Sequence, residues 1–85
     1  MTKLFKVNII TPEKTVYAGE VISLIAPGEL GYLGILANHA PLITNLVAGK
    51  IILKDNTGNP TTINSPGKGF LEVRENNANL ILDRI

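Results

Sequence analysis

With 85 residues, no cysteine and a formal net charge of +1, the chain fits a single domain over residues 1–85 that is held by packing, without disulfides or thiolate-bound metal. Its residues are 45% hydrophobic and 18% charged, as in a globular protein, and the basic residues are scattered from Lys3 to Arg84 without the cluster that a nucleic-acid partner requires. No apolar run reaches the length of a membrane span and the N-terminus lacks the apolar core of a signal peptide, so we expect a protein of the cytosol or of a cytosolic face.

Closely spaced glycines and prolines predict short strands joined by turns. The opening stretch LFKVNII alternates, with Phe5, Val7 and Ile9 on one face of an extended segment. Further along, GKIILK and TTIN predict two strands connected by the turn DNTGNP. We therefore expect an all-β fold, a small two-sheet β-sandwich or flattened barrel of roughly eight to ten short strands.

The last part of the sequence, GFLEVRENNANLILD, predicts a hairpin. Its arms are residues 70–74 and 78–82, and the turn is Glu75-Asn76-Asn77. The alternative is a C-terminal helix, because this stretch has no proline, but its asparagines favour turns over helices.

The stretches VISLIA, KIILK and NLILD have apolar residues at consecutive positions, whereas a sandwich strand alternates between a buried and an exposed face. Some of these side chains must therefore point outward. Several exposed together would form an interaction surface; the alternative is that a small domain tolerates scattered exposed apolar residues. The candidates are Ile22, Leu24, Ile52, Leu80, Ile81 and Leu82.

The stretch GELGYLGILANHAPL, residues 28–42, matches no phosphate-binding glycine motif, and no helix follows it. We expect Gly28, Gly31 and Gly34 to permit turns with positive φ. His39 is the only histidine and has no serine near it in the sequence, so we expect its ring to hydrogen-bond to neighbouring backbone. We predict no catalytic, cofactor-binding or metal-binding residue.

The sequence contains the specific block G-x-L-G-I-L-x-x-H-A-P-L, which begins at Gly31. With this block, and over essentially its whole length, it resembles the N-terminal β-sandwich domain of the epsilon subunit of bacterial F-type ATP synthase. The family often has a proline where this chain has Ala37 and an acidic residue where it has Tyr32. Many members continue into two C-terminal helices, whereas this sequence stops at Ile85, as in a short form or a trimmed chain. The other matching segments are Thr11-Pro12-Glu13, residues 17–21, Ala26-Pro27-Gly28, Thr44, residues 49–51, residues 69–73 and residues 80–82.

The resemblance implies a non-catalytic rotor subunit of the central stalk in a proton- or sodium-translocating ATP synthase. One face would pack on the γ subunit and one end would meet the polar loops of the membrane ring of c subunits. Membrane association, at the cytoplasmic face of the bacterial inner membrane, would arise only through the complex. The alternatives are a stand-alone ligand-binding β-sandwich, such as a carbohydrate module, and an enzyme.

The resemblance also implies contact residues. By this likeness Thr11, His39 and Thr44 lie at or near the γ contact. In the loop facing the c ring we expect Tyr32 to contribute more than Glu29, because an exposed ion pair is weak and screened by salt whereas a tyrosine ring buries area. The residues of this predicted c-ring contact loop are Glu29, Leu30, Gly31, Tyr32 and Leu33.

Overall fold

The computed structural model describes residues 3–85, and every regular element in that range is a short strand. This confirms the all-β class and the expected number of strands. In chain order the strands are β1 (Phe5–Ile10), β2 (Thr15–Val21), β3 (Ser23–Gly28), β4 (Gly31–Leu36), β5 (Leu42–Leu46), β6 (Gly49–Lys54), β7 (Pro60–Ser65), β8 (Gly69–Arg74) and β9 (Asn77–Leu82).

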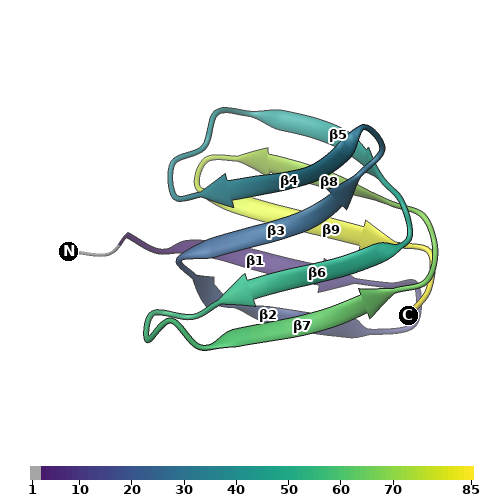
Figure 1. Ribbon diagram of the computed structural model, residues 1–85, viewed down its shortest axis with the longest axis horizontal. Helices are drawn as coiled ribbons and strands as arrows, with labels where there is room; N and C mark the ends of the chain where they lie inside the picture. The colour runs from purple at the N-terminus through teal and green to yellow at the C-terminus, as the bar shows by residue number, and fades with distance from the viewer. Residues whose placement is uncertain (1–2) are drawn as a thin grey trace.

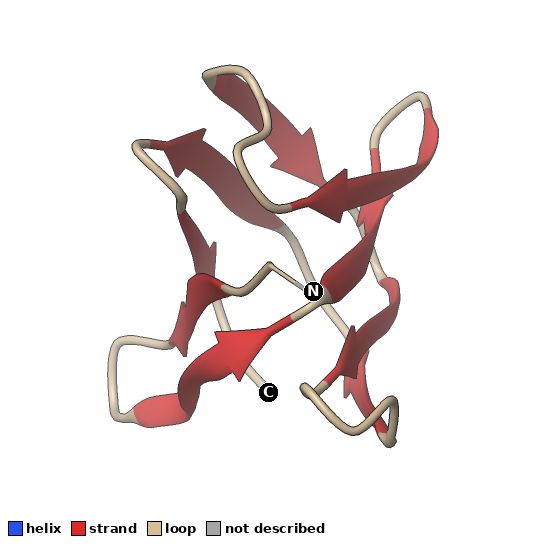
Figure 2. Ribbon diagram, turned by 90° about the vertical axis from the view of Figure 1, so that its left-hand side faces the viewer, coloured by secondary structure: helices blue, strands red, loops and turns tan. Residues whose placement is uncertain are grey.

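The nine strands form one hydrogen-bonded sheet that curls over, so that two halves face each other and meet at one corner; we call these halves the first and the second sheet (Figures 1 and 2). The first sheet has the order β2-β1-β9-β8-β5, and the second has β4-β3-β6-β7. Only one residue pair, Gly28 with Leu46, joins β5 to β3. The chain therefore passes from the first sheet to the second between the end of β5 and the start of β6. All pairs are antiparallel except β1 with β9.

The hydrophobic core lies between the two sheets. Strand β1 shows the predicted alternation, because Phe5, Val7 and Ile9 are buried while Lys6 and Asn8 are exposed. Each sheet thus contributes one apolar face, which is what stabilises a sandwich without disulfides. The other buried apolar residues are Val21, Leu24, Ala26, Ile35, Leu46, Ile51, Leu53, Leu71, Val73, Ala78, Leu80 and Leu82.

The predicted C-terminal hairpin is present as β8 and β9, and the helical alternative is wrong. Its turn is one residue shorter than expected, because Asn77 already pairs with Arg74. Glu75 and Asn76 have φ values of 49° and 62°, and two consecutive positive φ angles are what a two-residue hairpin of this twist requires. Asparagine adopts this conformation more readily than most residues, which explains the turn signal in the sequence.

The six apolar residues singled out in the sequence divide between inside and outside. Leu24, Leu80 and Leu82 are buried in the core, whereas Ile22 and Ile52 are half-buried. Ile81 alone is clearly exposed. The expectation that some of them point outward is confirmed, and β9 provides the main case.

Candidate interaction surface

The outer face of the first sheet presents a row of three exposed apolar side chains on adjacent strands. Phe70 of β8 pairs with Ile81 of β9, and Ile81 pairs with Ile10 of β1. Their exposed fractions are 53%, 48% and 39%. We call these three residues the apolar outer row.

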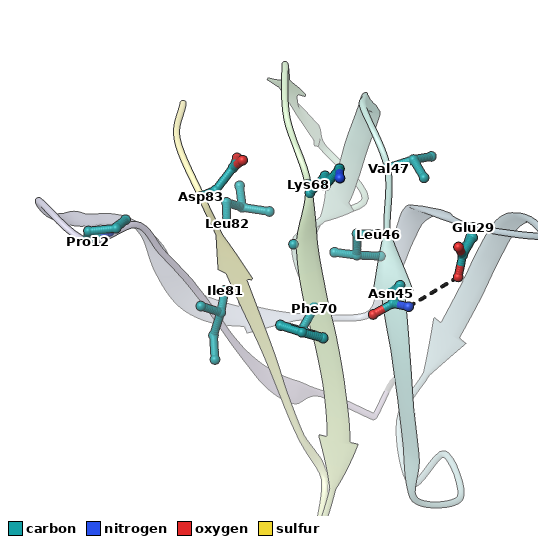
Figure 3. Close-up of a pocket in the computed structure, with 11 residues that line it drawn as sticks. Pro12, Glu29, Asn45, Leu46, Val47, Lys68, Phe70, Ile81, Leu82 and Asp83 are labelled. Atoms are coloured by element: carbon teal, nitrogen blue, oxygen red, sulfur yellow. Dashed lines mark hydrogen bonds between the residues drawn. The ribbon is translucent and has the colours of Figure 1, made fainter.

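A groove of about 530 Å³ lies over part of this row, at the end of the sandwich where β1 ends (Figure 3). Its wall includes Phe70, Ile81 and Val47, while Lys68 and Asp83 add charge. An apolar patch rimmed by polar groups is typical of an interaction site. The complete lining is Pro12, Glu29, Asn45, Leu46, Val47, Lys68, Gly69, Phe70, Ile81, Leu82 and Asp83.

The next row of the same face is mostly polar. Glu72 of β8 pairs with Asn79 of β9, which pairs with Asn8 of β1, and the Asn8 Nδ2 group donates to Asn79 Oδ1 at 3.4 Å. Ile43 of β5 pairs with Glu72 and is exposed at the edge of this row. Leaving a large apolar side chain in water forgoes up to about 1.5 to 3 kcal/mol, so the three apolar side chains concentrated in the outer row are the notable feature of this face.

The predicted c-ring contact loop is a hairpin between β3 and β4, with only Glu29 and Leu30 outside the strands. Gly31 has a φ of 129°, so the expected positive φ is found there, but the expectation was wrong for Gly28 and Gly34. Gly28 is required for a different reason, because a Cβ atom there would lie 2.7 Å from the Gly31 carbonyl oxygen.

Within this loop the five residues have different surroundings. The Glu29 carboxylate accepts a hydrogen bond from Asn45 Nδ2 at 3.2 Å. Tyr32 is exposed, but its hydroxyl accepts a hydrogen bond from the Lys50 N–H at 3.2 Å. Leu33 packs against the core. The Leu30 side chain is fully exposed to solvent.

The three predicted γ-contact residues lie at separate places along the first sheet. Thr11 is 7% exposed at the β1–β2 turn, where its hydroxyl oxygen accepts a hydrogen bond from the Lys14 N–H at 3.3 Å. Thr44 is half-buried in the middle of β5. His39 is exposed in the loop between β4 and β5, at the opposite end from Thr11, and its Nδ1 donates to the Ala40 carbonyl oxygen at 2.7 Å. This backbone bond of the histidine ring confirms the expectation.

Thr11 and the predicted c-ring contact loop lie at the same end of the sandwich. The groove shows this directly, because Pro12 and Glu29 both line it. In Figure 1 this is the right-hand end, where β3 turns into β4 and the chain reaches its C-terminus.

Two further kinds of functional feature that residues 3–85 could contain are a metal site and a membrane-spanning helix. No group of three or more His, Cys, Asp or Glu side chains is placed to hold a metal ion in that range. Nor does the same range contain a helix long and apolar enough to cross a membrane.

The turn between β6 and β7 is closed by the side chain of Asp55. Its Oδ1 atom accepts hydrogen bonds from the Thr57 hydroxyl at 2.6 Å and from the Thr57 N–H at 2.9 Å, and these bonds lower the pKa of Asp55. They close the predicted turn between β6 and β7.

These features define a class of protein, a small β-sandwich with one apolar stripe exposed on its outer face. The chain belongs to the family described as the ATP synthase delta/epsilon chain β-sandwich domain, whose model matches residues 4–85.

Curated relatives agree with this family. The chain is 45% identical over 78 residues to the ATP synthase epsilon chain of Leptospira interrogans, a match that covers 92% of this chain and 60% of that relative. It is 40% identical over 83 residues to the ATP synthase epsilon chain of Chlorobium limicola, covering 98% of this chain and 93% of the relative. The chain therefore spans less than two thirds of the Leptospira protein and almost all of the Chlorobium protein.

Solved structures show the same fold. A chain in the OSCP/F1/c-ring structure of the Euglena gracilis mitochondrial ATP synthase superposes with a TM-score of 0.88 at 14% identity, over 95% of this chain and 51% of that one. A chain in the central stalk/c-ring structure of the Tetrahymena thermophila mitochondrial ATP synthase gives a TM-score of 0.72 at 16% identity, over 89% and 60% respectively.

Sequence reasoning missed most of the apolar outer row. Ile81 was a candidate because it follows Leu80 in an apolar run. Phe70 and Ile10 each stand beside only one apolar residue, Leu71 and Ile9, in strands that otherwise alternate, and they were not singled out. Only the register that aligns β8, β9 and β1 brings the three together.

Proposed function

We propose that this chain is a non-catalytic rotor subunit in the central stalk of an F-type ATP synthase, linking the γ subunit to the c ring and supporting the coupling of proton or sodium flow to ATP synthesis. The observation that carries the proposal is the family match over residues 4–85, together with relatives named ATP synthase epsilon chain that cover 92% to 98% of this chain. This membership favours the stalk subunit over a stand-alone ligand-binding module. The proposal places the chain at the cytoplasmic face of the bacterial inner membrane, held there only through the complex.

The apolar outer row is the part of the surface proposed to pack on γ. Two of the residues implied by the family resemblance lie next to this row in the sequence but their side chains are not part of it. Thr11 follows Ile10 and is buried, and Thr44 pairs with the buried Leu71, on the opposite face of the sheet from Asn45. Covering half-exposed apolar side chains contributes on the order of 1 kcal/mol each. His39 would mark the far end of the same contact. The loop from Glu29 to Leu33 is proposed to face the c ring.

A charge in the apolar outer row should weaken assembly with γ. We expect Ile81→Asp to weaken binding to purified γ by about 2 kcal/mol or more, because an unpaired carboxylate would be buried in a desolvated interface. The measurement is isothermal titration calorimetry with γ from the enzyme of the same organism. The matched control is Ile25→Asp, since Ile25 is 38% exposed on the outer face of the second sheet.

Ile25→Asp should bind γ as the parent chain does. Equal affinities for Ile81→Asp and the parent would reject this face as the γ contact. A parent chain that does not bind γ at all would reject the stalk function itself.

A further inference from the structure

Three strands have a hydrogen-bonded neighbour on one side only. Within residues 3–85, β2 pairs only with β1, β7 only with β6, and β4 only with β3. In Figure 1, β4 lies beside β3 at one border of the second sheet and β7 lies at the other border. An edge strand leaves half of its backbone N–H and C=O groups without a strand partner, so it can pair with another chain.

Two of these edge strands carry features that hinder such pairing. Strand β2 contains the charged Glu20, and its register with β1 is irregular. Strand β7 begins with Pro60, which has no N–H group to donate. Strand β4, with the sequence GYLGIL, has neither charge nor proline and pairs with β3 in an unbroken register from Gly31 to Leu36. Of the three edges, that of β4 is therefore the most open to pairing.

Gly34, in the middle of β4, is not required by the fold of a single chain. Its φ is not positive, and a Cβ atom at this position would meet nothing within 4 Å. It pairs with Ile25 in the regular β3–β4 ladder, so it does not mark a bulge. A glycine inside a strand weakens the strand and often marks a place where another backbone or a ligand approaches closely. Gly34 thus leaves a notch on the outer face, at the edge of the second sheet.

A side chain that fits this notch lies two residues further along the strand. Leu36 is 64% exposed and is on the same face of β4 as Gly34, because side chains two positions apart in a strand point the same way. When two copies of β4 pair antiparallel about a twofold axis at Ile35, Leu36 of each copy lies opposite Gly34 of the other. The strand therefore contains both halves of a self-complementary contact, a protruding leucine and a notch that receives it.

The charge around β4 permits this contact and the length of the strand limits its strength. The sequence from Leu30 to Gly49 contains no Lys, Arg, Asp or Glu, so the paired segments bring no like charges together. A single pair of short strands buries much less than the roughly 1,200 to 2,000 Å² of a stable interface, so the association is weak. It is also closed, because two copies use up both free edges of β4.

We propose that the free chain forms a weak, reversible dimer in which β4 pairs antiparallel with β4 of a second copy about Ile35, and Leu36 of each copy lies over Gly34 of the other. The second sheets of the two copies then become one continuous sheet. The apolar outer row belongs to the first sheet and is not part of this contact, so the inference does not depend on the proposed function.

Sedimentation equilibrium of the purified chain, from about 1 µM to about 1 mM, measures the dimer, for which we expect a dissociation constant of about 0.1 mM. Gly34→Leu should weaken the dimer at least about tenfold, because the added side chain occupies the notch. Leu36→Gly should weaken it about tenfold, because the notch is left empty. The double variant Gly34→Leu/Leu36→Gly exchanges the leucine and the notch, so it should dimerise at least about tenfold more tightly than either single variant.

The matched control is Thr62→Leu, which adds a leucine to the same row of the outer face at the opposite edge of the second sheet. This row, with one residue from each strand, consists of Gly34, Ile25, Ile52 and Thr62. Thr62→Leu should leave the dissociation constant of the dimer within about twofold of the parent value. Circular dichroism and thermal unfolding of all the variants at low concentration should match the parent, since the three substituted positions are exposed.

A measurement on the parent chain alone tests the same contact. Amide hydrogen exchange in β4 should slow when the protein concentration is raised through the dissociation constant, whereas exchange in β2 and β7 should stay the same. A parent that remains monomeric up to about 1 mM would overturn the inference. So would protection of β2 or β7 in place of β4, or a double variant no tighter than the single ones. A dimer that is lost in Ile81→Asp but kept in Gly34→Leu would overturn it in favour of the apolar outer row.

Discussion

Tyr32 and Gly49 show how a single residue can make contacts inside the chain that its sequence neighbours do not indicate. From the sequence Tyr32 is an exposed aromatic in a loop, which is what a contact residue looks like. Its hydroxyl, however, is already bonded to the backbone of Lys50 on a strand 18 positions away. This bond joins β4 to β6 across β3. Sequence patterns describe only a residue's neighbours along its own strand, so the bond could not be predicted from them.

Gly49→Ala tests this contact between β4 and β6. A Cβ atom at position 49 would approach Pro27 Cβ and Tyr32 Oη below 3.0 Å, so we expect the free energy of unfolding to fall by about 1 to 3 kcal/mol. Gly34→Ala is the matched control, because a Cβ atom there meets nothing within 4 Å and its φ is not positive. The measurement is urea unfolding of both variants, which gives their free energies of unfolding. Equal stability of the two would mean that the contact relaxes without cost.

At the scale of elements, the β8–β9 hairpin was predictable because its signals are local. Alternation marks the arms and asparagines mark the turn, and both effects act within a few residues. The hydrogen bonds from this turn to distant segments of the chain were not predictable from the sequence. Asn76 Nδ2 donates to the Leu4 carbonyl oxygen at 2.9 Å, and Asn76 Oδ1 accepts from the Asn38 N–H at 2.7 Å. One side chain therefore links the hairpin turn to segments 38 and 72 residues away in the sequence.

Replacing Asn76 separates its two roles. Asn76→Gly keeps a residue suited to positive φ but loses both side-chain bonds, so we expect it to destabilise the fold by about 1 to 3 kcal/mol. Glu75→Gly at the neighbouring turn position, whose φ is 49°, should be neutral or slightly stabilising. Thermal unfolding followed by circular dichroism compares them. If Asn76→Gly is as stable as Glu75→Gly, the two bonds contribute nothing net.

For the whole molecule, the sequence was sufficient for the all-β class and for the existence of exposed apolar residues, but not for their arrangement. Alternation is a property of each strand, whereas the apolar outer row depends on how three strands are aligned with one another. The parallel pairing of β1 with β9 joins segments at opposite ends of the chain. That pairing places Ile10 beside Ile81, and no local pattern around either residue indicates it.

Adjacent residues of β9 belong to the two apolar surfaces of the whole molecule, the core and the apolar outer row. Leu80 is fully buried, whereas Ile81 belongs to the apolar outer row. We expect Leu80→Ala to lower the free energy of unfolding by about 2 to 5 kcal/mol, which approaches the total stability of a domain this small. Ile81→Ala should change it by less than about 1 kcal/mol, because its side chain is only half removed from water in the free chain. Its effect should instead be seen as weaker binding to γ. Denaturant unfolding and γ titration on the same preparations test both halves, and a loss of stability in Ile81→Ala equal to that of Leu80→Ala would show that the outer row supports the fold itself.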